Sequence, residues 1–202
     1  VKAAIATLGY SPNFGAKVMA AKRTNTIGAI IPTMENAIFA RGLQAFQEEL
    51  RLHGFTMLVA STNYQTEIEE DQIRALVARG ADALLLIGLA LSDAIYDFLA
   101  AQAVPTLVTW AYDAAQTRPS VGFDNKAAMV AMTQAVLARG HRRLGYITAD
   151  ISDNDRARAR FEGIKATIGD ADLQVVKTSY SIDNGATAFD TLMKQPGPPT
   201  AV

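Results

Sequence analysis

The sequence contains no cysteine, and this absence excludes disulfide bonds and thiolate metal sites. No uninterrupted apolar run approaches the roughly 18 residues that a membrane-spanning helix needs. The start of the chain also lacks the charged segment and continuous apolar segment of a secretory signal. Together these absences predict a cytoplasmic protein with no membrane partner.

Motifs of cofactor and catalytic chemistry are also missing. The segment after the first predicted strand, Pro32–Asn36, is neither GxGxxG nor GxxxxGKS, which disfavours dinucleotide and nucleoside triphosphate binding. Neither GxSxG nor HExxH occurs. The only two histidines are predicted to be a surface residue at a helix end, His53, and a turn residue, His141. We therefore expect no enzyme activity, no cofactor and no metal ion.

Negative charge is absent from the front of the chain. The net charge is −1, yet no acidic residue precedes Glu35. The first 24 residues, called the arm below, carry only positive charges, at Lys2, Lys17, Lys22 and Arg23. Such an asymmetry indicates a local contact with an anion rather than a basic protein as a whole.

The arm is predicted to contain the end of one helix, with Gly9 as its stop, and then a second, short helix. Ser11 can cap it, Pro12 suits its first position, and it holds only about ten residues, a length that is marginal alone in water. It therefore needs a partner helix or a bound surface. A disordered basic tail is the alternative. The turn at Tyr10–Asn13 and a small apolar face at Ala16, Met19 and Ala20 argue against it, and a wedge of this kind suits the minor groove of DNA.

After the arm, short apolar runs alternate with segments of helical periodicity, which predicts an α/β fold with doubly wound parallel sheets. The predicted strands are 27–31, 55–60, 83–87, 105–109, 121–123, 144–148 and 173–178. Four or five strand–helix units already make a full lobe, so we expect one lobe over residues 25–139 and part of a second over residues 140–202. Both ends are interpreted as cut, because the chain starts inside a helical pattern and Pro199–Val202 has the pattern of a strand start.

Ligands of open α/β sheets bind outside the carboxyl ends of the strands. The segments expected there carry an aromatic together with amide, carboxylate and guanidinium groups, a set that suits a polar ring-shaped ligand. These residues are Asn36, Phe39, Trp110, Asp124, Asn154, Asp155, Arg156 and Arg160. The alternative is a solvated helix start at Arg156, Arg158 and Arg160, with Asp153 and Asp155 as cap and counter-charges. The residues alone leave both interpretations open.

An ordered set of segments resembles the lactose/galactose repressor (LacI/GalR) family. These segments are Leu8–Asn13, Ala16–Met19, Thr26–Gly28, Asn36–Phe39, Gly140–Arg143 and Arg160–Gly163. The resemblance implies a homodimeric transcription repressor with a two-lobed, periplasmic-binding-protein-like effector domain. It also implies a helix-turn-helix before Val1 that reads the major groove of operator DNA, and paired hinge helices that enter the minor groove.

The same resemblance assigns roles to residues of this chain. The hinge contacts to DNA fall on Tyr10, Ser11, Pro12, Asn13, Ala16, Lys17 and Met19. Met19 stands where the family usually has a leucine wedge, and Gly15 costs about 1 kcal/mol of helix propensity. The effector contacts fall on Asn36, Ile38, Phe39, Trp110, Asp124, Asn154, Arg156 and Arg160.

The effector implied by the resemblance is a small polar molecule, with a sugar first and a purine as a further option. The expected function is therefore ligand-controlled DNA binding. A periplasmic sugar-binding protein with the same body is the alternative, but it predicts a secretion signal and no basic hinge. An enzyme on a doubly wound sheet is the third possibility, and no acid, base or nucleophile constellation supports it.

Overall fold

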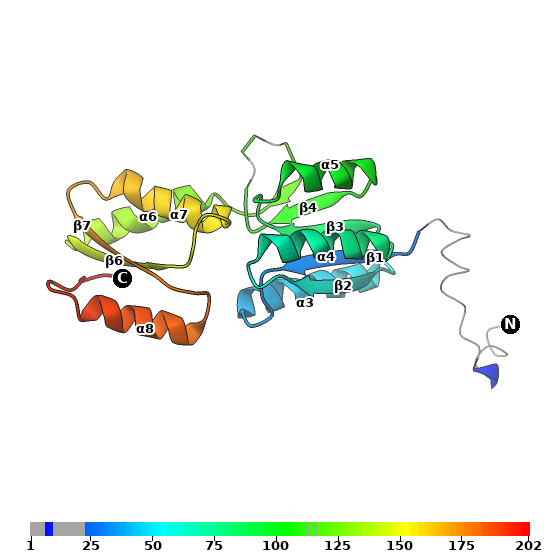
Figure 1. The fold of residues 1–202 in the computed structure, drawn as a ribbon, viewed down its shortest axis with the longest axis horizontal. Coiled ribbons are helices and arrows are strands. Elements are labelled where there is room, and N and C mark those ends of the chain that lie inside the picture. The colour runs from blue at the N-terminus through cyan, green and yellow to red at the C-terminus, as the bar shows by residue number, and fades with distance from the viewer. Residues whose placement is uncertain (1–6, 10–22, 113, 116) are drawn as a thin grey trace.

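The computed structural model describes residues 7–9, 23–112, 114–115 and 117–202. The seven predicted hinge residues, from Tyr10 to Met19, lie outside these residues. The described chain forms two parallel α/β lobes that lie side by side (Figure 1). The first lobe has a five-stranded sheet of order β2-β1-β3-β4-β5, and the second has the pair β6-β7.

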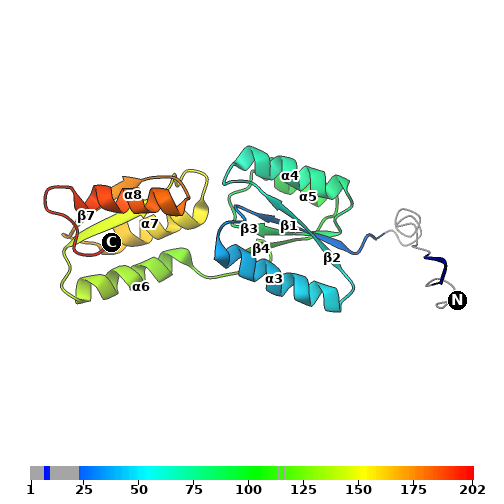
Figure 2. The same ribbon diagram turned by 90° about the horizontal axis from the view of Figure 1, so that it is seen from below.

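Helices join the first four strands of the first lobe, as the alternating pattern predicts, and a loop leads from the fourth to the fifth. Its strands are β1 Thr26–Ile31, β2 Thr56–Ser61, β3 Ala83–Ile87, β4 Thr106–Thr109 and β5 Ser120–Val121. Its helices are α3 Ala37–Leu52, α4 Thr66–Ala78 and α5 Asp93–Ala101. Figure 2 shows α3 on one face of the sheet and α4 and α5 on the other, so the sheet is doubly wound.

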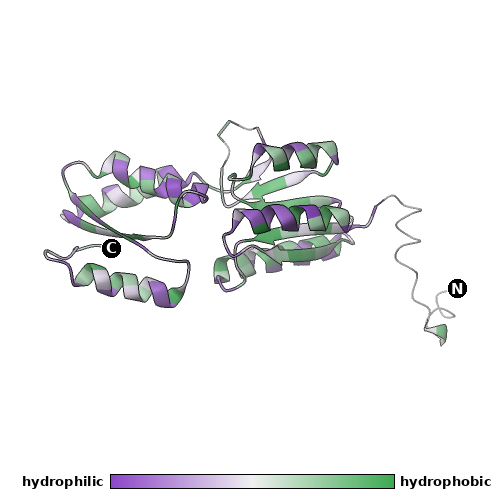
Figure 3. Ribbon diagram, in the orientation of Figure 1, coloured by the Kyte–Doolittle hydropathy of each residue, from purple (hydrophilic) through white to green (hydrophobic). Residues whose placement is uncertain are grey.

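Two hydrophobic clusters fill this lobe, one on each face of the sheet. Successive strand residues point to opposite faces, so the apolar runs of β1 and β3 supply both clusters. Ala29 and Ile31 belong to the cluster on the α3 side, whereas Ile30 packs in the cluster beneath α4 and α5. The central strands are accordingly among the most hydrophobic parts of the molecule (Figure 3).

The second lobe places helices on both faces of its strand pair. Its elements are α6 Asn125–Ala138, β6 Arg143–Thr148, α7 Asp155–Thr167, β7 Asp172–Lys177 and α8 Ile182–Met193. The chain then returns to β6, where Leu144 forms a parallel bridge with Ala201.

Helix α6 corrects the predicted lobe boundary. The sequence prediction assigned residues 125–139 to the first lobe, but α6 packs along α7 in the second lobe (Figures 1 and 2). The close approach depends on Gly163 of α7, where a Cβ would lie 2.6 Å from the carbonyl oxygen of Lys126. The Ala-rich helix has no strong apolar stripe, and its pattern therefore did not indicate which sheet it covers. None of the helices in the described part of the chain is long and apolar enough to cross a membrane.

Candidate functional site

The strands of both lobes end at a cleft between the lobes. Two cavities occupy it, a first compartment of about 480 Å³ and a second of about 610 Å³. Both are lined by Glu35 from the first lobe and by Thr178–Ser181 from the second, and both touch Tyr64. The cleft thus lies at the carboxyl ends of the strands, where a doubly wound fold places its ligand.

The first compartment contains a direct connection between the lobes. Nη1 of Arg156, at the start of α7, donates to the carbonyl oxygen of Ile87 at 2.8 Å. The backbone N–H of Leu89 donates to Oδ2 of Asp155 at 2.9 Å. Arg156 and Asp155 are also paired with each other at 3.1 Å. We call these contacts the latch.

Gly88 makes the latch possible. Its φ is +85°, and a Cβ built on it would lie 1.7 Å from Nη1 of Arg156 and 2.6 Å from Oδ1 of Asp155. A side chain at position 88 would therefore collide with both members of the pair as well as straining the backbone. Glycine at this position allows the guanidinium of the second lobe to reach the backbone of the first.

Two carboxyl groups of the first compartment have shifted pKa values. Burial raises the pKa of Glu69, in the first turn of α4, to about 7, and the nearby charges of Asp155 and Glu70 add to the rise while Arg156 opposes it. Hydrogen bonds from the backbone N–H and the hydroxyl of Ser152 lower the pKa of Asp150. The carboxyl group of Glu69, which lies beside the latch, therefore titrates near neutral pH.

A pair of stacked tyrosines lines both compartments. The rings of Tyr64, after β2, and Tyr180, after β7, are stacked with centroids 3.8 Å apart and an interplanar angle of 18°. Asn154 donates from Nδ2 to the hydroxyl of Tyr180 at 2.7 Å, and its Oδ1 caps α7. Burial raises the pKa of both tyrosines. Tyr64 has a φ of +60°, an uncommon value for a residue with a bulky side chain.

The second compartment is rich in hydroxyl groups. Among the described residues that line it, only Glu35 and Arg160 are charged, and Asn36 adds an amide from the start of α3. Hydroxyl groups come from Thr33, Tyr64, Tyr146, Thr148, Thr178, Ser179, Tyr180 and Ser181. Tyrosine faces together with many short polar groups suit a small polyhydroxylated molecule.

Four of the eight predicted effector residues line the cleft. Asn36 and Arg160 line the second compartment, and Asn154 and Arg156 line the first. Arg156 is engaged in the latch, and Arg160 donates from Nη1 to Oδ1 of Asn125 at 2.8 Å. Whether these residues contact an effector remains a proposal.

The other four predicted residues lie away from both compartments. Phe39 is 6% exposed and packs in the core cluster under α3, with its ring edge-on to Trp110 at 5.5 Å. Ile38 points to solvent and is 53% exposed. Asp124 accepts hydrogen bonds from the backbone N–H groups of Lys126 and Ala127, and its side chain therefore caps α6. None of these four residues lines either compartment, and their contacts with an effector stay a prediction.

The solvated-helix alternative holds for one arginine only. Arg158 is exposed and donates to the carbonyl oxygen of Ser152 at 2.7 Å. The cap of α7 is Asn154 rather than Asp153, and Asp155 serves the latch. Sequence reasoning missed Tyr64, Tyr180, Glu69 and Asn125. Tyr64 lies four residues after the end of the predicted strand 55–60, and that position is the signal that could have identified it.

Metal ligands do not gather in the described part of the chain, where no group of three or more His, Asp or Glu side chains could hold an ion.

Comparison with known proteins agrees with this architecture. The family described as periplasmic binding proteins and sugar binding domain of LacI family matches residues 24–202. The HTH-type transcriptional regulator GntR of Pseudomonas aeruginosa is 30% identical over 168 residues, which are 83% of this chain and 48% of that protein. GntR of Escherichia coli is 26% identical over 189 residues, 92% of this chain and 56% of that protein. The chain thus spans about half the length of these curated relatives.

Solved structures of transcription regulators also resemble this chain. A LacI family transcriptional regulator from Silicibacter pomeroyi has a TM-score of 0.84 and 26% identity, covering 95% of this chain and 59% of that one. The Cra transcriptional dual regulator from Pseudomonas putida, in complex with fructose 1-phosphate, has a TM-score of 0.78 and 23% identity, covering 89% of this chain and 68% of that one. The names of these relatives are those of transcription regulators rather than enzymes. From Thr24 onward the chain therefore belongs to the family of periplasmic binding proteins and LacI-type sugar binding domains.

Proposed function

We propose that this chain is the effector-sensing part of a transcription repressor, and that its interlobe cleft binds a small polyhydroxylated ligand, a sugar or a sugar derivative. The observation that carries the proposal is the second compartment, in which Arg160 and Asn36 from opposite lobes line a space surrounded by hydroxyl groups and tyrosines. A ligand that touches both lobes favours one relative orientation of them over others.

The cleft residues have different roles in this proposal. Arg160 supplies a charge-assisted donor and Asn36 an amide to the ligand, while Tyr64 and Tyr180 offer aromatic surface. Arg156 acts mainly by holding the lobes together, since it is bonded to the first lobe in the latch, whereas Asn154 fixes the hydroxyl of Tyr180 within the second lobe. The Cra neighbour was solved in complex with fructose 1-phosphate, which makes sugar phosphates one class worth testing.

The DNA side of the proposal rests on the arm and on its relatives. Curated relatives are HTH-type transcriptional regulators, and the arm before Thr24 carries only positive charge. Residues Tyr10 to Met19 would form the hinge that enters the minor groove at an operator, as part of a cytoplasmic homodimer. The change in lobe orientation would alter the spacing of the two hinges and so the affinity for DNA.

The ligand side is tested by thermal shift and calorimetry with a panel of neutral hexoses, amino sugars, sugar acids and fructose 1-phosphate. Arg160→Ala should weaken any binding found by about tenfold or more, because the variant loses a charge-assisted hydrogen bond. Arg158→Ala, on the solvent side of the same helix, serves as the matched control. A panel without a single binder, or full affinity in Arg160→Ala, contradicts the proposed site.

The DNA side is tested with a chimera that joins the helix-turn-helix of the Escherichia coli relative to the front of this chain. Its operator affinity should fall steeply with salt, because the arm would neutralise phosphates. Met19→Gly should weaken binding further, since it removes the proposed wedge, whereas the exposed Met34→Gly should not. Binding that is indifferent to Met19→Gly contradicts the hinge assignment.

A further inference from the structure

One buried amide joins the proposed ligand arginine to the backbone of the opposite lobe. Asn125, the first residue of α6, is only 5% exposed. Its Oδ1 accepts the hydrogen bond from Nη1 of Arg160 at 2.8 Å. Its Nδ2 donates to the carbonyl oxygen of Trp110 at 3.1 Å and, at 3.4 Å, to that of Phe123. Both ends of the side chain are therefore used, one toward each lobe.

Trp110 is itself fixed to the first lobe. It follows β4 with a φ of +58°, and its N–H donates to the carbonyl oxygen of Val121. Its ring packs edge-on against Phe39 of α3, and a Cβ added at Gly42 would lie 2.5 Å from the ring. The left-handed backbone and the tight ring contact leave the Trp110 carbonyl little freedom to follow a moving partner.

We infer that Asn125 is a positioning residue that couples the direction of the Arg160 guanidinium to the relative orientation of the two lobes. The path runs from Arg160 on α7 through the Asn125 amide to the Trp110 carbonyl, and then through the ring of Trp110 to α3. A ligand that draws Arg160 into the second compartment therefore pulls on a group bonded to the first lobe. This role rests on the proposed function, because it gives Arg160 the part of a ligand residue.

The chemistry of the site explains why an amide is needed. Asn offers an acceptor to the guanidinium and a donor to the carbonyl on two separate atoms of one short side chain. Asn125→Asp keeps an acceptor for Arg160 but turns a second oxygen toward the carbonyl groups of Trp110 and Phe123, where no donor remains. Asn125→Leu removes both contacts while keeping the number of heavy atoms and the branching of the side chain. The two variants thus separate the two halves of the link.

The latch also joins the lobes, so its contribution has to be separated. Each Asn125 variant is therefore made both in the wild-type chain and in an Arg156→Ala background, in which the latch is loosened. Lys126→Ala is the matched control, because it changes the next residue of α6, whose side chain is exposed and forms only a 3.8 Å ion pair with Glu162.

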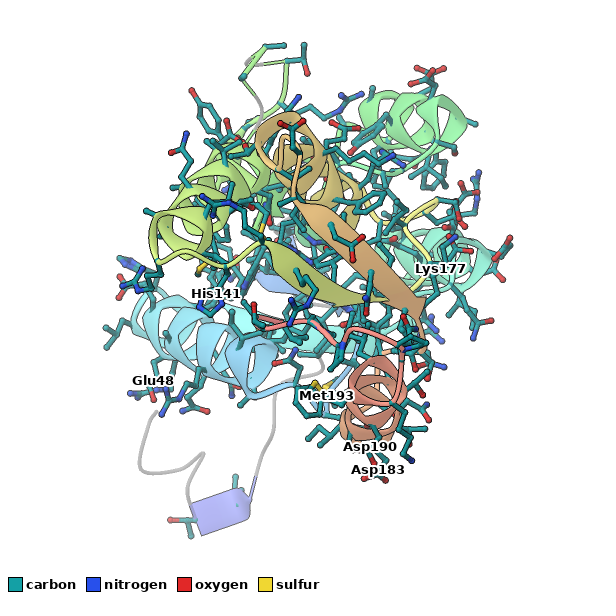
Figure 4. The ribbon with its side chains drawn as sticks, turned by 90° about the vertical axis from the view of Figure 1, so that its left-hand side faces the viewer. Glu48, His141, Lys177, Asp183, Asp190 and Met193 are labelled. Atoms are coloured by element: carbon teal, nitrogen blue, oxygen red, sulfur yellow. The ribbon has the colours of Figure 1, made fainter. Side chains whose placement is uncertain are left out.

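The experiment measures the distance between the lobes by pulsed electron spin resonance, without ligand. The chain contains no cysteine, so cysteines introduced at two exposed positions are the only labelling sites. Glu48 on α3 and Asp190 on α8 lie on different lobes, and both point away from the molecule (Figure 4). The probes are spin labels at these two positions in the 202-residue chain.

We expect the Arg156→Ala chain to keep the narrow distance distribution of the wild type, because Asn125 still holds the lobes. Adding either Asn125→Asp or Asn125→Leu should raise the population of displaced lobes by about fivefold or more, the scale of a typical coupling between sites. Lys126→Ala should change nothing. If Asn125→Leu does not fold, Asn125→Asp decides the matter with the same readout.

Two results would overturn the inference. If the distance distribution between the labels in Asn125→Asp is as narrow as in the control, the Trp110 contact does not couple the lobes. If both variants lower only the melting temperature, Asn125 has a purely structural role. Neither result depends on a ligand, so failure here is distinct from failure of the proposed function, which the Arg160→Ala binding experiment measures.

Discussion

The ring of Tyr64 in the first lobe stacks on the ring of Tyr180 in the second, with their centroids 3.8 Å apart. No space for a ligand exists between the rings at this distance. A ligand in either compartment therefore lies beside the pair rather than between the rings. In either case the stack is a contact between the lobes, and its presence or loss reports on their relative orientation.

The stack predicts a distinctive titration of the tyrosines. Burial raises the pKa of Tyr64 and Tyr180 above the ordinary value, because the phenolate would be poorly solvated there. A spectrophotometric titration should therefore show Tyr64 and Tyr180 ionising late. Tyr64→Phe and Tyr180→Phe should each remove one late step, whereas the half-exposed Tyr112→Phe should leave both in place. A titration in which the two variants match the control contradicts the buried stack.

The raised pKa of Glu69 predicts that the stability of the chain depends on pH near neutrality. Its pKa in the folded chain is raised from 4.5 to about 7, so the folded chain prefers the protonated group. The stabilising contribution of that proton is therefore complete below about pH 4.5 and is lost as the pH rises through about 7. The lost stability amounts to at most about 3 kcal/mol, since one pKa unit corresponds to about 1.36 kcal/mol.

Denaturant unfolding of Glu69→Gln from about pH 5 to about pH 8 tests this dependence. The glutamine side chain of the variant cannot ionise, so the variant should lose less stability over this range than the wild type, and the difference between them should grow with pH. Glu67→Gln, which changes an exposed carboxylate in the same first turn, should follow the wild type. Parallel curves for the wild type and Glu69→Gln would contradict the raised pKa.

Substitution of Gly88 tests the latch, and a second glycine separates the cost of the collision from the cost of the backbone conformation. Gly88→Ala should destabilise the chain through its positive φ and through the collision with Arg156. Gly140 has a nearly equal φ of +89°, but nothing lies within 4 Å of a Cβ there, so Gly140→Ala carries the backbone cost alone.

Gly88→Ala should therefore lower the free energy of unfolding by about 1–3 kcal/mol more than Gly140→Ala does. Adding Arg156→Ala to Gly88→Ala should recover part of that excess, because the main obstacle is removed. Equal costs at the two glycines would mean that the latch contributes little to stability.

The fold was largely predictable because its signals are local. The apolar run Ala83–Ile87 predicted β3 at its observed bounds, and the predicted strand 144–148 matches β6, Arg143–Thr148, to within one residue. Both predictions depend on neighbouring residues and on a fixed period, and a single sequence contains that information.

The site was predicted only in part because its contacts are not local. Tyr64 and Tyr180 meet from different lobes, and no spacing in the sequence links them. Asn36 and Phe39 both belong to the start of α3, yet one lines the cleft and the other enters the core. Which side of a helix start faces a second lobe depends on the packing of that lobe, and the sequence pattern of the first lobe does not contain it.

Hydrogen bonds to Asp82 join the end of the arm to the first lobe. Its two carboxylate oxygens accept hydrogen bonds from the backbone N–H groups of Thr24, at 3.2 Å, and Asn25, at 2.8 Å. The hydroxyl of Thr24 also donates to the carbonyl oxygen of Gly80 at 2.6 Å. The turn before β3 therefore holds the segment through which any motion of the arm would reach the sheet.

Asp82→Asn should release one of the two N–H groups, because only one oxygen remains as an acceptor. The expected cost is about 1–2 kcal/mol, the range for a hydrogen bond to a charged group that is partly exposed. Hydrogen exchange should show faster exchange at Thr24 and Asn25 with unchanged protection in β3, and Asp71→Asn on the exposed side of α4 should alter neither. If protection of β3 falls as much as that of Thr24, Asp82 supports the whole sheet rather than the entry of the arm. In that case a signal from the cleft would need another route to the DNA side.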